Sequence, residues 1–372
     1  MPENKKKIFY LTTTNWWWAK QRPQFIAEGL SKFYKVTYVY PKTYGNRKNA
    51  GIPTDISTDL ELLQIFKLPL NRFRLIRFLN RSLFLLQILP FISRYNFFWF
   101  SHPIIYNQIK RVLPNHSVIV YDCMDDHLEF PSVKRNKKQL TELFESEKNL
   151  VNIADTLIFS AEHLKDIVIS RYKSARDYSV INNAVSKEFI WPLRDKDLIS
   201  QDFTKYDNHF KLVYTGTISA WFDFDLILES LKTFPNIVYF LAGPAEINIP
   251  SHERIIYLGP VSHTKIKSLF GISDALVMPF RDNDLVRSVN PVKIYEYIAG
   301  CKLSIILKYP ETDKFRDFVY LFSTTEEYLT LISRLIEGIL QMKKTSEECV
   351  AFCCQNTWDE RIKEIIQILD GE

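Results

Sequence analysis

Residues 290–300 read Asn-Pro-Val-Lys-Ile-Tyr-Glu-Tyr-Ile-Ala-Gly and lie between two short apolar runs. Residues 274–279 (Asp-Ala-Leu-Val-Met-Pro) precede them and residues 303–307 (Leu-Ser-Ile-Ile-Leu) follow, so both runs have the length and composition of buried strands. Pro291 suits the first turn of a helix, where its missing N–H costs nothing, and Gly300 suits the helix end. The stretch therefore predicts a strand, loop, helix, strand unit of a parallel α/β fold.

The start of this predicted helix carries the chemistry of an anion site. A helix N-terminus presents N–H groups and a partial positive charge, and Lys293 adds a full charge in the first turn. Glu296 follows one turn later on the same side, where its carboxylate can accept hydrogen bonds from hydroxyl groups. Together they suit a diphosphate and a ribose diol, the two parts of a nucleotide sugar. The spacing equally fits an amphipathic helix whose Lys and Glu form a surface ion pair.

The pattern Asn-Pro-x-Lys-x-Tyr-Glu-Tyr, followed by Ala-Gly, resembles the donor-site helix of GT-B glycosyltransferases. It looks most like bacterial enzymes of the teichuronic-acid type and the related xanthan glucuronosyltransferase. The resemblance implies two Rossmann-like parallel-sheet domains facing a cleft, with a C-terminal helix that crosses back to the first domain. It also implies that Lys293 contacts the donor phosphate and that Glu296 holds the ribose. It covers residues 210–315 and, in patches, residues 8–40 and 117–185.

A second donor-site segment follows the strand predicted at residues 211–215. Gly216 comes next, and a glycine in such a turn lets the backbone approach a phosphate or a sugar closely. The pattern Tyr-x-Gly-x-Ile-x-x-Trp-Phe-Asp at residues 214–223 resembles the sequence of the family at this place. The residues expected to bind the donor are Gly216, Thr217, Ser219, Met278, Ser288, Asn290, Val292, Lys293 and Glu296.

An acidic segment ends the buried strand predicted at residues 117–121. It reads Tyr-Asp-Cys-Met-Asp-Asp-His over residues 121–127. Adjacent carboxylates repel each other, which raises one pKa toward a value useful to a general base, but aspartate here would equally cap a following helix. The segment resembles the region in which the xanthan relative has its catalytic Asp. That resemblance assigns the role of base to Asp125, with Asp126 as the alternative.

A tryptophan-rich loop follows the first predicted strand, residues 7–11. Ligands lie outside the carboxyl ends of strands in parallel sheets, so we expect this loop to face a cleft. Three consecutive tryptophans cannot all face a core, so at least one should be exposed. They would stack on a sugar, enter lipid headgroups or form a packed aromatic lid. The resembling enzymes carry an Arg-Pro-Gln or Arg-Pro-His element here, which implies acceptor binding by Asn15, Trp16, Trp17 and Arg22.

Length and composition allow two globular domains. The chain has 372 residues, of which 46% are hydrophobic and 24% charged. We expect an acceptor-side domain at 1–188, a nucleotide-sugar donor domain at 189–355, and a helix at 356–372 that packs back on the first domain. Five cysteines, odd in number and without zinc-site spacing, predict thiols in a reducing cytoplasm, and we see no signal-peptide pattern before the first strand.

The net charge of +5 conceals a strong asymmetry. Residues 1–120 carry 18 Lys and Arg against 5 Asp and Glu, and no acidic residue occurs from Leu62 to Tyr121. Residues 68–100 alternate arginines with apolar residues at spacings of three and four until Pro90 breaks the run. This pattern is typical of a basic amphipathic helix on an anionic membrane, although a helix covering a sheet face with its arginines in water fits too.

These features predict a cytoplasmic protein, peripheral at the inner face of the cytoplasmic membrane. No apolar run reaches the ~20 residues that a membrane span needs. Nucleic acid binding is not expected, because no reader pattern of a nucleic-acid-binding fold is present.

The expected reaction transfers a sugar from a nucleotide diphosphate, with UDP as the expected nucleotide, to a glycan or lipid-linked acceptor in surface polysaccharide biosynthesis. Related retaining enzymes carry a Glu eight residues before the ribose Glu, where this chain has Ser288. This departure favours an inverting single displacement. Asp-x-Asp triplets recur in three loops, at Asp195/Asp197, Asp223/Asp225 and Asp282/Asp284. They are unspecific, so no metal or other cofactor is expected. The alternatives are a degenerate, membrane-associated GT-B binding protein and a nucleotide-sugar epimerase.

Overall fold

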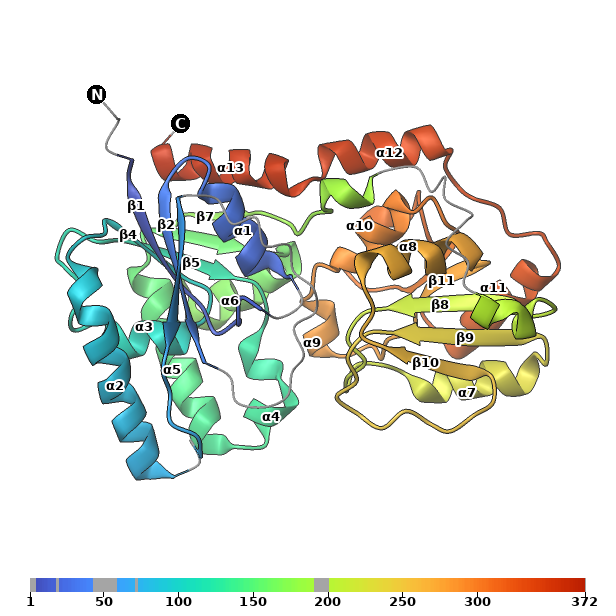
Figure 1. Ribbon diagram of the computed structural model, residues 1–372, viewed down its shortest axis with the longest axis horizontal. Helices are drawn as coiled ribbons and strands as arrows, with labels where there is room; N and C mark the ends of the chain where they lie inside the picture. Colours follow the sequence, from blue (N-terminus) through green and yellow to red (C-terminus); the bar gives the residue numbers. More distant parts are fainter. Residues whose placement is uncertain (1–4, 18–19, 43–58, 71–72, 191–200, 372) are drawn as a thin grey trace. The chain divides into compact units, whose positions relative to one another are not determined.

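The computed structural model describes residues 5–17, 20–42, 59–70, 73–190 and 201–371. Its contacts divide the chain into two compact units, drawn in Figure 1. Unit 1 comprises residues 1–182 and 358–372, and unit 2 comprises residues 183–357. From the sequence we expected domain boundaries after residues 188 and 355. The two compact units are divided after residues 182 and 357. Each unit is a parallel sheet covered by helices.

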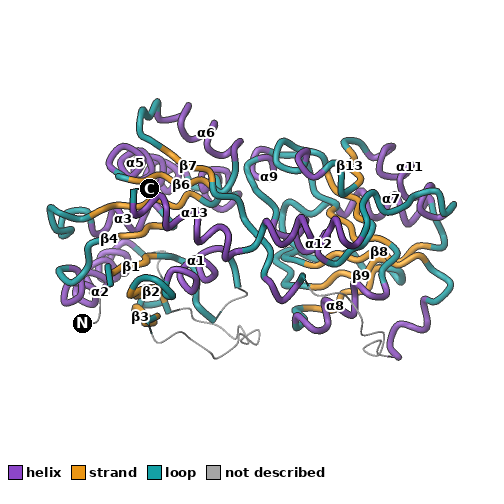
Figure 2. The backbone as a smooth tube through the Cα atoms, turned by 90° about the horizontal axis from the view of Figure 1, so that it is seen from above, coloured by secondary structure: helices purple, strands orange, loops and turns teal. Residues whose placement is uncertain are grey.

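The sheet of unit 1 has seven parallel strands in the order β3-β2-β1-β4-β5-β6-β7. Figure 2 shows these strands side by side. Strand β4 is buried at every position, as expected of a parallel sheet covered on both faces. The strand bounds are β1 Lys7–Leu11, β2 Lys35–Pro41, β3 Leu60–Ile65, β4 Phe97–Phe100, β5 Val118–Cys123, β6 Thr156–Phe159 and β7 Tyr178–Val180.

The two faces of this sheet are packed differently. On one face, Phe9, Leu11 and Phe98 belong to an apolar core that also takes side chains from helices α2, α3, α5 and α6. On the other face, Tyr10 stacks between Tyr38 and Trp99 with ring centroids 5.4 Å apart in each pair. The helix bounds are α1 Arg22–Leu30, α2 Arg74–Ile92, α3 Pro103–Ile109, α4 Pro131–Lys134, α5 Lys137–Ile153, α6 Glu162–Tyr172 and α13 Trp358–Asp370.

The last helix, α13, packs on α1 within unit 1 (Figure 1). The rings of Phe25 and Trp358 stack with their centroids 4.8 Å apart. Gly29 admits the helix because a Cβ at that position would lie 2.4 Å from Cγ1 of Ile362. A glycine in α1 therefore permits the close contact that joins the C-terminal segment to the first sheet.

The sheet of unit 2 has six parallel strands in the order β10-β9-β8-β11-β12-β13. The chain fills one half of the sheet outward from β8 and the other half outward from β11, so the strand order reverses between these two. Ligands of open α/β sheets bind at the carboxyl ends of the strands at such a point. The strand bounds are β8 Phe210–Thr215, β9 Ile237–Ala242, β10 Ile255–Gly259, β11 Ala275–Met278, β12 Ser304–Leu307 and β13 Tyr320–Phe322. The helix bounds are α7 Phe224–Thr233, α8 His263–Ile272, α9 Asp284–Arg287, α10 Val292–Ala299, α11 Thr325–Ile336 and α12 Ser346–Gln355.

Helix α2 bears on two expectations from the sequence. Pro90 does not end the helix, which continues for two further residues to Ile92, although a proline there gives up one intrahelical hydrogen bond. The second expectation, that no apolar run reaches the ~20 residues of a membrane span, concerns the same segment. Among the described residues, α2 alone is long and apolar enough to cross a membrane by length and composition, and 11% of its most apolar window is buried.

Candidate functional site

Helix α10 begins at the carboxyl end of β11, beside the point where the strand order of unit 2 reverses. Pro291 is its N-cap residue rather than its first helical residue, so the helix starts one residue later than the proline predicted. Val292 and Lys293 are then the first two helical residues, and both are half-buried. Their N–H groups belong to the first turn, which has no intrahelical acceptors.

The loop after β8 lies against Lys293. Gly216 has φ +151°, a conformation that L side chains rarely adopt. A Cβ added there would lie 2.7 Å from Oη of Tyr214 and 3.2 Å from Cε of Lys293. Two segments that the sequence assigned separately to a donor site are therefore in contact, and glycine is required between them.

A second glycine supports the first. Gly243, at the end of β9, has φ +139°, and a Cβ there would lie 2.0 Å from the carbonyl oxygen of Gly216. The N–H of Gly216 donates to the carbonyl of Ala242 at 2.8 Å. The backbone of the β8 loop is thus held directly on the β9 loop, without an intervening side chain.

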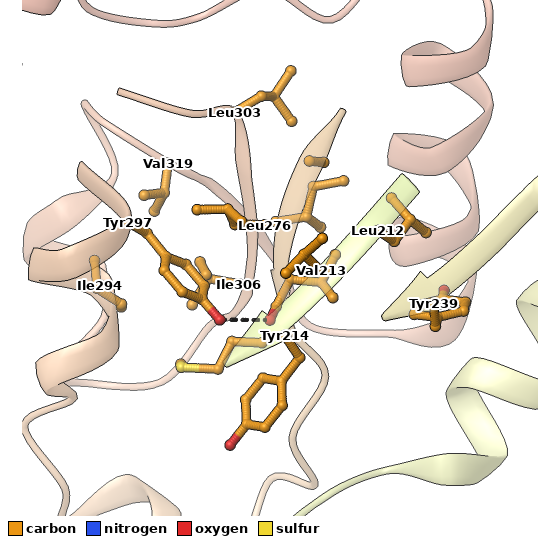
Figure 3. Packing of buried hydrophobic residues seen from close by; sticks show 14 of the residues in the cluster. Leu212, Val213, Tyr214, Tyr239, Leu276, Ile294, Tyr297, Leu303, Ile306 and Val319 are labelled. Atoms are coloured by element: carbon orange, nitrogen blue, oxygen red, sulfur yellow. Dashed lines mark hydrogen bonds between the residues drawn. The ribbon is translucent and has the colours of Figure 1, made fainter. Parts of the chain in front are cut away.

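Tyr297 joins α10 to the two central strands. Its hydroxyl donates to the carbonyl of Val277 at 3.2 Å, the bond dashed in Figure 3, and accepts from the N–H of Thr215 at 3.3 Å. Burial raises the pKa of Tyr297, so this hydroxyl remains a proton donor at physiological pH. The helix start is therefore fixed relative to the ends of β8 and β11.

Lys293 and Glu296 form an ion pair, with Nζ 2.9 Å from Oε2. Their side chains are 29% and 12% exposed, so the pair is partly buried rather than on the surface. The ion pair that the spacing of the two residues also allowed is therefore formed. The pair leaves a cation and a carboxylate together at the edge of the Gly216 loop.

Unit 1 has its own charged cluster at the carboxyl end of β5. Arg22, on α1, forms a forked ion pair with Asp122 through Nε at 3.0 Å and Nη2 at 2.8 Å from Oδ1. Its Nη1 also donates to the carbonyl of Ile181 at 2.7 Å. Both charged residues are buried, so the guanidinium ties α1, β5 and the segment after β7 together.

Asp126 is likewise engaged in an internal ion pair. Its Oδ1 accepts from Nη1 of Arg171 at 3.0 Å and caps the turn at Leu128 by accepting its N–H at 3.3 Å. Arg171 lies 3.5 Å from the fully buried Glu147, which also accepts from the hydroxyl of Tyr172 at 2.7 Å. A carboxylate held this way is a poor general base, because protonation would break its pair with Arg171.

Asp125 differs from both neighbouring aspartates. Burial raises the pKa of its carboxyl, with a smaller contribution from the charges of Asp122 and Asp126, while His127 and Arg22 oppose the rise. The sequence predicted a raised pKa from carboxylate repulsion, but burial is the larger cause. The direction of this shift moves the pKa of Asp125 toward the range of a general base.

Two histidines that the sequence analysis did not assign lie beside this cluster. The rings of His102, after β4, and His127, after β5, stack with their centroids 4.4 Å apart. Burial lowers the pKa of His102 well below its ordinary value, so this ring is neutral. Nε2 of His127 is buried and has no hydrogen-bond partner among the described residues. Because β4 and β5 are neighbouring parallel strands, residues just after their carboxyl ends lie close together. Recognising that pairing in the sequence would have placed the two histidines side by side.

Comparisons with known proteins bear on the fold. No family model matches the chain. It is 22% identical over 216 residues to the "Putative teichuronic acid biosynthesis glycosyltransferase TuaH" of Bacillus subtilis strain 168, a match covering 54% of this chain and 53% of that protein. The chain thus spans about half the length of this curated relative. Sucrose-phosphate synthase from Thermosynechococcus elongatus superposes over 99% of both chains with a TM-score of 0.74 and 13% identity.

HepE of Anabaena in complex with UDP-glucose superposes over 98% of this chain and 100% of its own, with a TM-score of 0.70 and 14% identity. The chain has the GT-B fold. The fold expected from residues 290–300 is therefore confirmed. A glycosyltransferase from Rickettsia africae ESF-5 also superposes, with a TM-score of 0.64, 14% identity and 98% of each chain covered.

Within this GT-B chain, four of the residues predicted to bind the donor are buried. Met278 and Ser288 are fully buried, and Oγ of Ser288 donates to the carbonyl of Leu285 at 2.8 Å. Oγ of Ser219 donates to Glu246 at 2.8 Å. The two serine hydroxyls thus bond to neighbouring loops of unit 2, and donor contact by these three residues stays a prediction.

Asn290 is the fourth. Its Oδ1 accepts from the N–H of Asn183 at 2.9 Å, and its carbonyl accepts from Nδ2 of Asn183 at 2.7 Å. Asn290, the residue before the N-cap of α10, is 1% exposed. Its two hydrogen bonds connect the start of α10 to Asn183, at the start of unit 2. Thr217 and Val292 are half-buried and remain predicted donor contacts, together with Gly216, Lys293 and Glu296.

The residues predicted to bind the acceptor fall into two groups, one buried and one partly exposed. Trp16 is buried against Tyr38, with ring centroids 4.9 Å apart, and Arg22 is buried in its pair with Asp122. Both residues are 4% exposed, so acceptor binding by these two residues stays a prediction that their burial does not favour. Trp17 is 37% exposed and its N–H donates to Oδ1 of Asn15 at 2.8 Å. Trp17 and Asn15 remain candidates, while Trp18 lies outside the described residues.

The Asp-x-Asp triplets do not form metal-ligand clusters in the part of the chain that the structure describes. There, no three His, Cys, Asp or Glu side chains lie together as metal ligands would. Asp225 pairs with Arg281 and Asp282 with Arg287, each at 2.7 Å. The triplet at residues 195–197 lies outside the described residues.

Proposed function

We propose that this chain is a glycosyltransferase that moves a sugar from a UDP-sugar to a glycan or lipid-linked acceptor. The contact between the Gly216 loop and Lys293, at the start of α10 and beside the strand-order reversal, carries the proposal. The matched TuaH is named a glycosyltransferase, and HepE was solved with UDP-glucose. Both support a nucleotide-sugar donor.

The diphosphate and the ribose of a UDP-sugar each have a matching group in unit 2. The diphosphate would lie on the first-turn N–H groups of α10 and on the backbone of the Gly216 loop, where no Cβ intervenes. Lys293 would exchange its bond to Glu296 for the phosphate oxygens. Glu296 would then accept hydrogen bonds from the ribose hydroxyls. In this proposal the ion pair between Lys293 and Glu296 forms only when no donor is bound. The diphosphate then replaces Glu296 as the partner of Lys293, and the ribose replaces Lys293 as the partner of Glu296.

The proposed reaction is an inverting, metal-independent single displacement. Asp125 takes the proton of the acceptor hydroxyl, the acceptor oxygen bonds to the anomeric carbon, and the bond from that carbon to the diphosphate breaks. Lys293 and the α10 N-terminus stabilise the charge on the departing UDP. Ser288, at the position of the Glu in related retaining enzymes, is fully buried and bonded to a carbonyl, which supports inversion.

We also propose that the protein works in surface polysaccharide biosynthesis, on the cytoplasmic side of the membrane. The name of TuaH supports this pathway class. The basic first 120 residues support an anionic membrane surface as a partner. Unit 1 would thereby act where lipid-linked acceptors are found.

UDP and UDP-sugars are expected to raise the melting temperature of the purified protein. A ligand at 100 times its dissociation constant stabilises by about 2.7 kcal/mol, or roughly 5–10 °C for a domain of this size. A thermal-shift screen across UDP-, GDP- and dTDP-sugars measures the effect and identifies the base. A chain stabilised by none of them would contradict the proposal. Stabilisation without sugar transfer or donor hydrolysis would indicate a binding protein, and release of a free epimer would indicate an epimerase.

A further inference from the structure

Helix α2, labelled in Figure 1, carries a row of large apolar side chains that are exposed to solvent. Its exposed large apolar side chains lie three, four or eleven residues from Leu75 or Phe78, apart from the adjacent pair Phe78 and Leu79, and these spacings place them on one face of a helix. Each is between 37% and 68% exposed. Single exposed apolar residues are ordinary, but a continuous row marks an interaction surface. This row, called the α2 stripe, comprises Leu75, Phe78, Leu79, Leu86 and Leu89.

The opposite side of α2 is fastened to unit 1. Ile88 and Ile92 enter the core beneath the sheet. The amide of Asn80 pairs with both backbone groups of Leu68, at 2.7 and 3.1 Å, and the amide of Gln87 pairs with both backbone groups of Phe66, at 2.8 and 3.1 Å. These four hydrogen bonds would be lost if α2 entered hydrocarbon as a transmembrane span, where unpaired amides are costly. The helix is therefore built to stay on unit 1 with one face outward.

The surroundings of the α2 stripe are basic. Arg74, Arg77, Arg81 and Arg94 are all exposed, and no acidic residue occurs from residue 62 to residue 121. A surface of this composition complements anionic phosphates. It does not complement a second copy of itself, because the arginines of the two copies would face one another.

We propose that α2 lies flat in the interface of an anionic bilayer, with the α2 stripe in the acyl boundary and its arginines on lipid phosphates. This inference rests on the peripheral location suggested above and names the surface responsible. Helices of this kind bind through buried apolar area together with attraction to anionic lipid. Both contributions can be removed separately by mutation.

Vesicle flotation of the full chain tests the inference. The protein should float with vesicles of equal parts phosphatidylcholine and phosphatidylglycerol, and not with phosphatidylcholine alone. The triple variant Leu75→Ser, Phe78→Ser, Leu86→Ser should lower the partition coefficient by more than about tenfold, because three apolar groups leave the acyl boundary. The triple variant Arg74→Gln, Arg77→Gln, Arg81→Gln should lower it by roughly 100-fold, or about five-fold per arginine.

Matched controls make these losses specific. Phe33, Ile153 and Tyr178 are comparably exposed on other elements of unit 1, at 52%, 44% and 48%, and their serine variant should float as the parent does. The variant Arg135→Gln, Lys137→Gln, Lys138→Gln removes the same charge elsewhere and should cost less than fivefold. Unchanged melting temperature and unchanged UDP binding show that each α2 variant is folded, and they keep failure of the donor site distinguishable from failure of this surface.

Several outcomes would overturn the inference. These are no flotation, equal flotation with phosphatidylcholine alone, and losses in the controls as large as in the α2 variants. Retention after an alkaline carbonate wash would show a spanning helix instead. Dissociation of a dimer by the serine variant, with flotation unchanged, would assign the stripe to a second copy of the chain.

Discussion

Replacement of Asp125 by Asn is expected to lower turnover by roughly 10²–10⁴-fold, or about 3–5 kcal/mol of transition-state stabilisation. The amide keeps the shape of the carboxylate but cannot accept the acceptor's proton. UDP affinity should not change, because the donor groups belong to unit 2. Steady-state kinetics with calorimetry of UDP binding separates the two effects.

The pH profile gives a second reading of the same variant. A base works in its ionised form, and burial raises the pKa of Asp125 above its ordinary value of 3.8. The acidic limb of kcat/KM in the parent should therefore have its midpoint above 3.8, and the Asn variant should lack that limb. Asp166→Asn serves as a control, since its side chain is 67% exposed and surface substitutions seldom matter. Near-parental turnover by the Asp125 variant would exclude it as the base.

Replacement of Gly243 by Ala is expected to destabilise unit 2 by about 3–5 kcal/mol and to abolish UDP binding. The added Cβ would lie 2.0 Å from the carbonyl oxygen of Gly216, and backbone atoms cannot rotate away as a side chain can. The β8 loop would have to move off β9 and away from Lys293. Denaturant unfolding and UDP calorimetry measure the two losses.

Gly259→Ala is the matched control. Gly259 also has a positive φ, +68°, but no atom lies within 4 Å of the position its Cβ would take. Only the conformational cost of about 1 kcal/mol is expected there. Equal destabilisation by the two substitutions would show that the contact between the two glycine loops does not hold the donor site.

The residues that restrict the backbone made the fold readable from the sequence. Pro291 and Gly300 bound α10 to within one residue, and the apolar runs on either side are β11 and β12. Strand β3 was not predicted, because it is an edge strand with only its two end residues buried, so it lacks the continuous apolar run of a central strand. Pro90 did not indicate the end of α2, because the helix continues for two residues beyond it, to Ile92.

The sequence indicated which types of residue lie at the candidate site, but not the residues to which they bond. Lys293 lies beside Gly216 and Glu296, since strand ends meet at one edge of a parallel sheet, and donor binding by the three residues stays a prediction. Arg22 and Asn290 were predicted to bind ligands, but they pair with Asp122 and Asn183, each about 100 residues away in the chain. A polar residue at a strand end has the same appearance in sequence whether it faces ligand or holds another loop. Burial distinguishes the two cases.

Calorimetric titration of UDP into the Lys293→Ala variant tests the central claim most directly. The ammonium is expected to hold the diphosphate through charge-assisted hydrogen bonds, which contribute about 1.5–3 kcal/mol. The variant should therefore bind UDP roughly 10- to 100-fold more weakly than the parent. Lys232→Ala, whose parent side chain is 79% exposed on α7, should bind as the parent does. Equal UDP affinity in the Lys293 variant and the parent would contradict a donor site at the start of α10.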